Sequence, residues 1–449
     1  MIIKNKPELS TTELRKQVLD IVEAGITSVL PENIMRDAVS YNPARRFLTV
    51  KDYTYDLAKG RVFVIGGGKA SGLMAKTLEN ILSPDNIFAG VVNCNCRSSD
   101  YQTKKIKIVE AGHPLPDQRG LDGVSQMLAL KDRYAIGEND LVICLLSGGG
   151  SALMPCPVEG VSLKDKQSVT ELLLGCGATI HEINAVRKHL SRTKGGQLGH
   201  YYAPAPVVTL ILSDVIGNDL DVIASGQTCP DSSTFFDAHN VLERFDLLAK
   251  VPESVRGFLD RGCQGGVEET PKTLINCYNF IIGDNTLALA AMAEKAKGLG
   301  FNPCTVTAAQ KGDTSTVAQL RATEILDGRY RGHDLIILGG ETTPKLPVNA
   351  GKGGRNQHYA VVSMLAMANY PGDWVVASVG TDGSDYLPDV AGAMVDNNSL
   401  ARAKKQGVDI KYYLDRYDSN TLLKRIGESL IITGSTGTNV GDVIVYALN

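Results

Sequence analysis

The sequence predicts an α/β fold in which strands and helices alternate along most of the chain. Short apolar runs, such as RVFVI at 61–65, each end in a loop rich in glycine and small polar residues. Helical patterns, such as the one from Leu73 to Leu82, lie between many of these runs. Strands that alternate with helices form parallel βαβ units, and continuous apolar runs indicate strands covered on both faces. We therefore expect Rossmann-like three-layer α/β/α domains with largely parallel sheets.

The first 45 residues are expected to be helical, because Leu14, Val18 and Ile21 recur at helical spacing and Thr11 or Thr12 can cap the start. Five strand–loop pairs then follow. They are RVFVI with GGGKASG, LVICLL (141–146) with SGGGSAL, VVTLIL (207–212) with SDVIGND, DLIIL (334–338) with GGETTPK, and WVVASV (374–379) with GTDGSD. Ligands of open parallel sheets bind outside the carboxyl ends of the strands, so these five loops are the candidate site.

A domain boundary is expected near 258–275, where DRGCQGGVEETPKT is rich in glycine and polar residues and has no apolar period. Three of the five strand–loop pairs precede this stretch and two follow it. We therefore expect an N-terminal domain over 1–262 and a C-terminal domain over 263–449, facing an interdomain cleft.

Composition excludes several classes of function. The 46 basic and 49 acidic residues give a formal charge of −3, which offers no footprint for nucleic acid. No apolar run reaches the roughly 18 residues of a membrane span, and the N-terminus lacks the apolar segment of a secretory signal. The nine cysteines have no CxxC spacing, which argues against disulfides or zinc. We expect a cytoplasmic protein without a membrane partner, and the oligomeric state, a homodimer included, stays open.

The loops at 66–72 and 147–152 favour anion binding. Backbone N–H groups at a helix N-terminus attract an anion, and glycine lets the backbone approach it. Lys69 adds a mobile charge, and the loop is not a Walker A motif because Phe63 stands where that motif needs glycine. Tight turns alone would also explain both loops. The candidates are Gly67 and Gly68 for the nucleotide, Lys69 for charge on the transferring phosphoryl group, and Ser147, Gly148, Gly149 and Ser151 for the substrate.

The helix expected over 181–198 offers a carboxylate anchor in Arg187 or Lys188. Adjacent residues of a helix point about 100° apart, so Arg187 and Lys188 cannot both lie on the same face of the helix. Arginine suits bidentate recognition better, although a solvated helix face would also explain both. Asp214 follows a strand directly, where aspartate acts as a metal ligand, a general base or a helix cap.

The C-terminal loops supply carboxylates and further anion ligands. Several carboxylates on one loop repel each other unless a cation offsets them. The metal candidates, which the sequence does not rank, are Glu341, Asp382 and Asp385. The candidates for nucleotide or phosphoryl binding are Gly339, Gly340, Arg355, Asn356 and Thr381.

Ten short motifs follow one another along nearly the whole chain: GGGKA, GHPLPD (112–117), SGGGSALM, NAVRKHLSRTKGGQL, SDVIGND, SGQTCPD, GGETT, GKGGRNQ, GTDGSD and STGTNVGD (435–442). In this order, the set resembles the class II glycerate kinase family of MOFRL type. The resemblance implies transfer of the γ-phosphoryl group of ATP to the 2-hydroxyl of D-glycerate, with Mg²⁺ or another divalent cation. It also implies that Lys69 and Arg355 lie at the catalytic centre and that Asp214 matches the aspartate of the SDV motif.

Two other classes of function compete with the kinase. A hydroxypyruvate reductase would need a nicotinamide fingerprint, but no loop pairs GxGxxG with an acid about twenty residues later. A non-catalytic sensor of a small phosphorylated acid would not need so many carboxylates beside glycine-rich loops. The sequence therefore favours the kinase.

Overall fold

The computed structural model describes residues 1–96 and 98–449. The chain forms two compact units. The central unit comprises Ile34–Ile282, and the terminal unit comprises Met1–Asn33 together with Gly283–Asn449.

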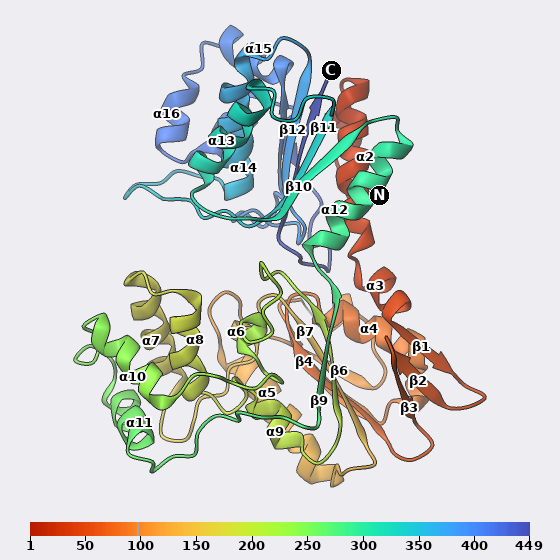
Figure 1. Ribbon diagram of the computed structural model, residues 1–449, viewed down its shortest axis with the longest axis vertical. Helices are drawn as coiled ribbons and strands as arrows, with labels where there is room; N and C mark the ends of the chain where they lie inside the picture. The colour runs from red at the N-terminus through yellow and green to blue at the C-terminus, as the bar shows by residue number, and fades with distance from the viewer. Residues whose placement is uncertain (97) are drawn as a thin grey trace. The chain divides into compact units, whose positions relative to one another are not determined.

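The central unit is built on a six-stranded sheet of order β6-β5-β4-β7-β8-β9 (Figure 1). Its strands are β4 (Val62–Gly67), β5 (Ala89–Cys94), β6 (Ile106–Glu110), β7 (Leu141–Ser147), β8 (Val207–Leu212) and β9 (Cys277–Gly283). The β6-β5, β5-β4, β4-β7 and β7-β8 pairs are all parallel. Strand order reverses between β4 and β7, which is the switch point where such sheets bind ligands.

Helices cover both faces of the central sheet and also form a helical cluster of their own. They are α3 (Pro31–Ala38), α4 (Ser71–Leu82), α5 (Gln118–Tyr134), α6 (Gly150–Leu153), α7 (Leu163–Gly175), α8 (Ile180–His189), α9 (Gln197–Tyr202), α10 (Phe235–Arg244) and α11 (Glu253–Cys263), with short 3-10 turns η1 (Pro84–Asn86), η2 (Ser98–Asp100) and η3 (Ile223–Ser225). Apolar side chains of α5 and α9 share one core with the sheet, whereas α7, α8, α10 and α11 enclose a second. A small antiparallel sheet of β1 (Val39–Asn42), β2 (Phe47–Val50) and β3 (Tyr53–Asp56) completes the unit.

The terminal unit has a mixed sheet of order β10-β11-β15-β12-β13-β14. Its strands are β10 (Pro303–Gln310), β11 (Leu335–Gly340), β12 (Trp374–Gly380), β13 (Gly392–Asp396), β14 (Leu430–Ile431) and β15 (Asp442–Leu448). The last strand, β15, inserts between β11 and β12 and is antiparallel to both. The start of β15 therefore lies level with the ends of β11 and β12.

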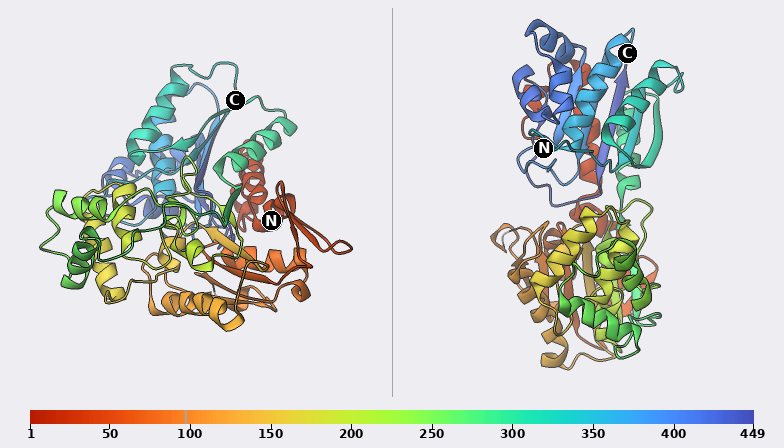
Figure 2. Two further views of the ribbon diagram at one scale, coloured as in Figure 1. Left: turned by 60° about the horizontal axis from the view of Figure 1, so that its bottom comes forward. Right: turned by 90° about the vertical axis from the view of Figure 1, so that its left-hand side faces the viewer.

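Helices flank the terminal sheet on both faces. Figure 1 shows α13 and α14 on one face and α2 and α12 on the other, and the red α2 beside the blue strands in Figure 2 shows the same packing. The helices are α1 (Lys6–Leu9), α2 (Glu13–Ser28), α12 (Asn285–Gly298), α13 (Thr314–Leu326), α14 (Arg355–Ala366), α15 (Asn397–Lys405), α16 (Ile410–Asp415) and α17 (Ser419–Ile426), with the 3-10 turn η4 (Met367–Asn369). Within the described ranges, no helix combines the length and apolar character needed to cross a bilayer.

The α/β class is confirmed, and all five predicted strands form where the apolar runs lie. Thr12 caps α2 by accepting from the Arg15 N–H at 3.2 Å. The terminal sheet is mixed rather than largely parallel, because β13 and β15 run against the other strands. The predicted helical start also ends earlier, at Ala38, where β1 follows.

The compact units differ in two places from the division expected at 262/263. The stretch at 264–276 stays with the central unit, because Thr270 Oγ1 donates to Asp231 Oδ2 at 2.9 Å and β9 then joins the central sheet. The first 33 residues belong to the terminal unit, where Gly25 of α2 lies directly against Met292 of α12. The cleft expected between the units stays a prediction.

Candidate functional site

The first candidate site lies at the switch point of the central sheet, where the loops after β4 and β7 contact each other. The backbone N–H of Lys69 donates to the Gly148 carbonyl at 2.8 Å, and that of Ala70 donates to Ser147 Oγ at 2.9 Å. A Cβ on Gly68, whose φ is +156°, would lie 2.1 Å from Ser147 Oγ. Only glycine therefore lets the loops approach this closely.

Lys69 and His113 both border Gly149, whose φ of +80° is in the left-handed region. A Cβ on Gly149 would lie 3.0 Å from His113 Nε2 and 3.2 Å from Lys69 Cγ. The structure thus adds an imidazole to the predicted lysine and glycine-rich loop. Sequence reasoning gave His113 no role, although the GHPLPD motif that contains it was one of the signals of resemblance.

The hydroxyl of Ser151 is the start of a short hydrogen-bonded chain. Ser151 Oγ lies 2.6 Å from Ser225 Oγ, which donates to Asn184 Oδ1 at 2.9 Å. Ala224 and Ser225 have φ values of +51° and +60°, which are strained for residues with a side chain. Such strain costs about 1–3 kcal/mol per residue and clusters at functional sites. This strain favours a functional site that includes Ser225 as well as the loop that carries Ser151.

The adjacent residues Arg187 and Lys188 of α8 have different environments. Lys188 is 1% exposed, and its ammonium contacts Asp221 Oδ1 and, at 3.2 Å, Asp231 Oδ1. Burial favours a raised pKa for Asp231, but Lys188 and three hydrogen bonds hold that pKa below its ordinary value. By contrast, no acceptor among residues 1–96 and 98–449 binds the Arg187 guanidinium. Arg187 is thus the cation available to an anionic ligand.

Two buried lysines add positive charge around Arg187. Lys166 Nζ donates to the Leu190 carbonyl at 3.0 Å, and Lys194 Nζ donates to the Ser151 carbonyl at 2.8 Å. Burial and the charge of Arg187 lower the pKa of Lys166 to about 7. Burial, Lys166 and Arg187 also lower the pKa of Lys194 well below its ordinary value. No carboxylate in the described chain pairs with any of these three cations, so an anion entering here would relieve their repulsion.

Asp214 lies at the same edge of the central sheet. Leu212, the last residue of β8, pairs in register with Ser147 at the end of β7. Asp214 follows two residues later and is half-buried, in the loop where Ser213 Oγ accepts from the Val215 N–H at 3.2 Å. The structure therefore brings Asp214 to the carboxyl ends of the strands, as predicted from its position after a strand.

The second candidate site lies in the terminal unit, where Asp442 begins β15. Asp442 pairs in register with Gly340 of β11 and with Gly380 of β12. Its carboxylate accepts from Arg355 Nε at 2.6 Å and from Arg355 Nη2 at 3.0 Å, and Glu341 Oε1 lies 2.6 Å from Arg355 Nη1. Burial opposes the charge of Arg355, but these acids raise the pKa of its guanidinium above its ordinary value. Arg355 is thus held between two carboxylates.

Asp385 caps the N-terminus of α14. Its two carboxylate oxygens accept from the backbone N–H groups of Asn356 at 3.0 Å and Gln357 at 2.8 Å. Burial raises the pKa of Asp385 to about 6 against these hydrogen bonds. The Asn356 amide is engaged as well, because it donates to Asp442 Oδ1 at 2.9 Å and accepts from Ser378 Oγ at 2.6 Å. These side chains build the frame around Arg355.

The three predicted metal ligands do not form a metal cluster. Both oxygens of Asp385 are occupied by α14, and Asp382 Oδ1 accepts from the Ser384 N–H at 2.9 Å. Outside residue 97, no group of three or more His, Cys, Asp or Glu side chains is arranged to hold a metal ion. A cation carried entirely by protein ligands therefore does not fit. Glu341 remains as a partly exposed carboxylate beside Arg355.

The predicted nucleotide glycines make room for packing inside the sheets. A Cβ on Gly339 would lie 1.8 Å from Asn285 Oδ1, one on Gly340 would lie 2.3 Å from the Gln310 carbonyl oxygen, and one on Gly67 would lie 2.6 Å from Met154 Cγ. Close packing thus accounts for these glycines without a phosphate.

Thr381 is fully buried. Its hydroxyl donates to the Gly441 carbonyl at 2.7 Å and accepts from the Val440 N–H at 2.9 Å. Thr381 thus holds the segment before β15 that presents Asp442.

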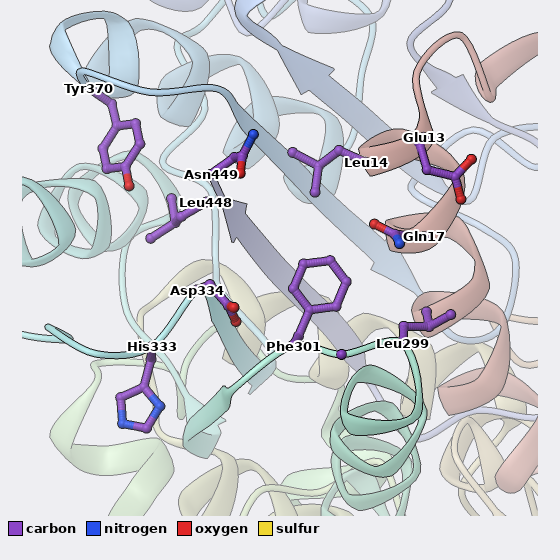
Figure 3. Close-up of a pocket in the computed structure, with 11 residues that line it drawn as sticks. Glu13, Leu14, Gln17, Leu299, Phe301, His333, Asp334, Tyr370, Leu448 and Asn449 are labelled. Atoms are coloured by element: carbon purple, nitrogen blue, oxygen red, sulfur yellow. The ribbon is translucent and has the colours of Figure 1, made fainter.

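A pocket of about 570 Å³ opens elsewhere in the terminal unit (Figure 3). Its lining includes Phe301, Asp334 and Leu448. Asp334 precedes β11 and Leu448 ends β15, so this pocket lies at the opposite end of the sheet from Asp442. It therefore does not belong to the candidate site.

Comparisons with known proteins agree with the ordered motifs. A domain of unknown function, DUF4147, matches residues 17–260, and the MOFRL family matches residues 334–442. A glycerate 2-kinase from Pyrococcus horikoshii is 37% identical over 439 residues, which are 96% of this chain and 97% of that protein. A protein of Agrobacterium vitis with the provisional name hydroxypyruvate reductase is 38% identical over 395 residues, covering 86% of this chain and 98% of that protein. The crystal structure of a glycerate kinase from Thermotoga maritima has a TM-score of 0.83 and 36% identity, covering 97% of this chain and all of that one.

Proposed function

The chain belongs to the class II glycerate kinase family, and we propose that it is an ATP-dependent glycerate 2-kinase, which transfers the γ-phosphoryl group of ATP to the 2-hydroxyl of D-glycerate. The observation that carries this proposal is the site at the switch point of the central sheet. There, within residues 1–96 and 98–449, no protein acceptor binds Arg187 and no acidic side chain pairs with the buried lysines Lys166 and Lys194. Such a site suits a small carboxylate.

The acceptor's carboxylate binds Arg187 rather than Lys188, whose charge is already neutralised by Asp221 and Asp231. The 2-hydroxyl is on the carbon next to that carboxylate, and the 3-hydroxyl is one carbon further out. A fixed anchor therefore separates the two hydroxyls by about one bond length, and a displacement of about 1 Å can change the rate by about 10². Asp214 orients the attacking hydroxyl or takes its proton.

Lys69 and Arg355 neutralise charge on the transferring phosphoryl group. Phosphoryl transfer leaves little covalent work for the protein, so positioning and electrostatics dominate catalysis. Lys69 is carried by the loop joined to Gly148, and the backbone hydrogen bond at 2.8 Å supports a fixed position. Arg355 is fixed by its bidentate contact with Asp442.

A divalent cation, most simply Mg²⁺, enters with the nucleotide. Arg355 already contacts the carboxylates of Glu341 and Asp442, and a metal-bound nucleotide would bring positive charge of its own to these acids, which a bare polyphosphate would not. Mg²⁺ keeps several waters and is commonly held by substrate phosphates with one or two carboxylates. Glu341 is our first choice for that carboxylate and Asp382 our second.

The product of the reaction tests the proposal directly. The enzyme is incubated with ATP, Mg²⁺ and D-glycerate, and ADP release is followed together with phosphoenolpyruvate formed by added enolase. We expect phosphoenolpyruvate without phosphoglycerate mutase, since enolase uses 2-phosphoglycerate directly. Formation only after mutase is added would instead identify 3-phosphoglycerate. NADH oxidation with hydroxypyruvate, without ADP release from glycerate, would make the protein a reductase.

A further inference from the structure

The Asn184 side chain on α8 has a buried amide nitrogen without a partner in the part of the chain that the structure describes. Asn184 is 2% exposed, and its Oδ1 accepts from Ser225 Oγ, whereas no described residue accepts a hydrogen bond from Nδ2. Buried polar groups without a partner are rare in folded proteins, and each calls for an explanation. A ligand atom that accepts a hydrogen bond would supply one.

In the structure the amide oxygen of Asn184 faces Ser225, whose hydroxyl donates to Asn184 Oδ1 at 2.9 Å. With the Ser225 proton used in this way, Ser225 Oγ accepts from Ser151 Oγ at 2.6 Å. Ser151 in turn is held through its carbonyl by Lys194. This arrangement leaves the amide nitrogen of Asn184 as a donor.

Arg187 lies one turn further along α8. Residues three apart on a helix share a face, so the Arg187 guanidinium and the Asn184 amide belong to the same side of α8. Among the described residues, neither the Arg187 guanidinium nor Asn184 Nδ2 has a hydrogen-bond acceptor. A carboxylate has two oxygens and only accepts, so it matches a pair of donors of this kind.

We propose that Asn184 is a substrate-binding residue, whose Nδ2 donates to one oxygen of the glycerate carboxylate while Arg187 binds the other. The inference rests on the proposed function and deepens it, because it assigns the second point of contact for the carboxylate. Ser225 is a positioning residue that keeps the amide in its donating orientation. Two points of contact fix the rotation of the acceptor about its carboxylate, which one arginine does not.

The test is the replacement Asn184→Asp, which keeps the shape and the acceptor for Ser225 but replaces the donor with a second carboxylate oxygen. We expect the KM and the calorimetric Kd for glycerate to rise by about 100-fold or more, with the KM for ATP unchanged. Ser225→Ala should raise the glycerate KM by a smaller factor, about 3- to 10-fold. His181→Asp, which adds a carboxylate on the exposed first turn of the same helix, is the matched control and should leave both KM values unchanged.

Thermal unfolding is measured for each variant. If Asn184→Asp does not fold, Asn184→Ala is used, and the binding of D-lactate and of glycerol is measured by calorimetry without ATP, because D-lactate carries a 2-hydroxyl and would itself be an acceptor. D-lactate keeps the carboxylate, so its dissociation constant should rise by about 10-fold or more, whereas that of glycerol, which lacks the carboxylate, should not change.

Two negative results have different meanings. A folded Asn184→Asp enzyme with wild-type Kd and KM for glycerate, or an unchanged D-lactate constant in Asn184→Ala, would overturn the role of Asn184. A wild-type enzyme that releases no ADP with glycerate would overturn the proposed function itself.

Discussion

Replacing either Arg187 or Lys188 with methionine should give opposite results, although the two residues are adjacent. Methionine keeps much of the length of either side chain and removes the charge. No residue in the described ranges accepts a hydrogen bond from Arg187, so Arg187→Met leaves none of these residues unpaired. Lys188→Met leaves Asp231, whose side chain is 0% exposed, without its cation.

The structure gives the size of both effects. Breaking a buried ion pair by removing one partner costs about 3–5 kcal/mol. Asp231 keeps hydrogen bonds from Ser233 and Thr270, and Asp221 is 28% exposed, so we expect the lower end, about 3 kcal/mol, for Lys188→Met. A hydrogen bond from a charged donor to a carboxylate is worth about 1.5–3 kcal/mol, so Arg187→Met should raise the glycerate KM by roughly 10- to 10²-fold.

Thermal unfolding and steady-state kinetics separate the two variants. Lys188→Met should lower Tm by about 6–12 °C with little change in glycerate KM for the folded enzyme. Arg187→Met should keep or raise Tm, raise the glycerate KM and leave the ATP KM unchanged. An Arg187→Met enzyme that is strongly destabilised yet has a wild-type glycerate KM would refute the reasoning.

Four further results are expected. Lys69→Ala should lower kcat by about 10²–10³ in the ADP-release assay, since it removes a donor to the transferring group, and a near-normal kcat/KM would exclude that role. Asp442→Asn, which removes half of the bidentate contact with Arg355, should lower kcat by about 10-fold or more without changing the glycerate KM; an unchanged kcat would mean that Arg355 needs no such anchor. The pKa of Lys166 is about 7 in the folded protein and 10.5 for an ordinary lysine, so between these pH values the unfolded state binds more protons and the free energy of unfolding should rise with pH. Urea unfolding at pH 7 and 9 should show a smaller rise in this free energy for Lys166→Met than for the wild type, and an equal rise in both proteins would contradict the prediction. EDTA should abolish turnover and Mg²⁺ restore it, whereas full turnover in EDTA would refute the metal requirement.

The local patterns of the sequence were enough to predict the strands and the loops that follow them. An apolar run that ends in SGGGS predicts both a strand and the loop after it, because the strand and its loop are neighbours in the chain. Their convergence followed from a general rule on parallel sheets. The sequence therefore predicted that the loops carrying Lys69 and Gly148 lie close together, but not the particular hydrogen bond that joins these two residues.

Features that depend on distant parts of the chain were missed. Asp442 lies beside Gly340 because β15 runs against its neighbours, and no local pattern gives a strand its direction. The choice between Arg187 and Lys188 depends on Asp221 and Asp231, which are more than thirty residues away along the chain. Helix α2 joins the terminal unit because its apolar face packs on α12, which no composition shift could indicate.

Charge balance is what distinguishes the two candidate sites chemically. In the described chain no carboxylate pairs with Arg187, Lys166 or Lys194 of the central site, and burying the charged forms of these groups is unfavourable unless an anion completes the site. Arg355 in the terminal unit, by contrast, already contacts the carboxylates of Glu341 and Asp442. These acids would repel a bare triphosphate, whereas a metal-bound nucleotide brings positive charge of its own. We therefore expect the glycerate carboxylate to bind in the central unit, and we expect the nucleotide to bind together with a divalent cation.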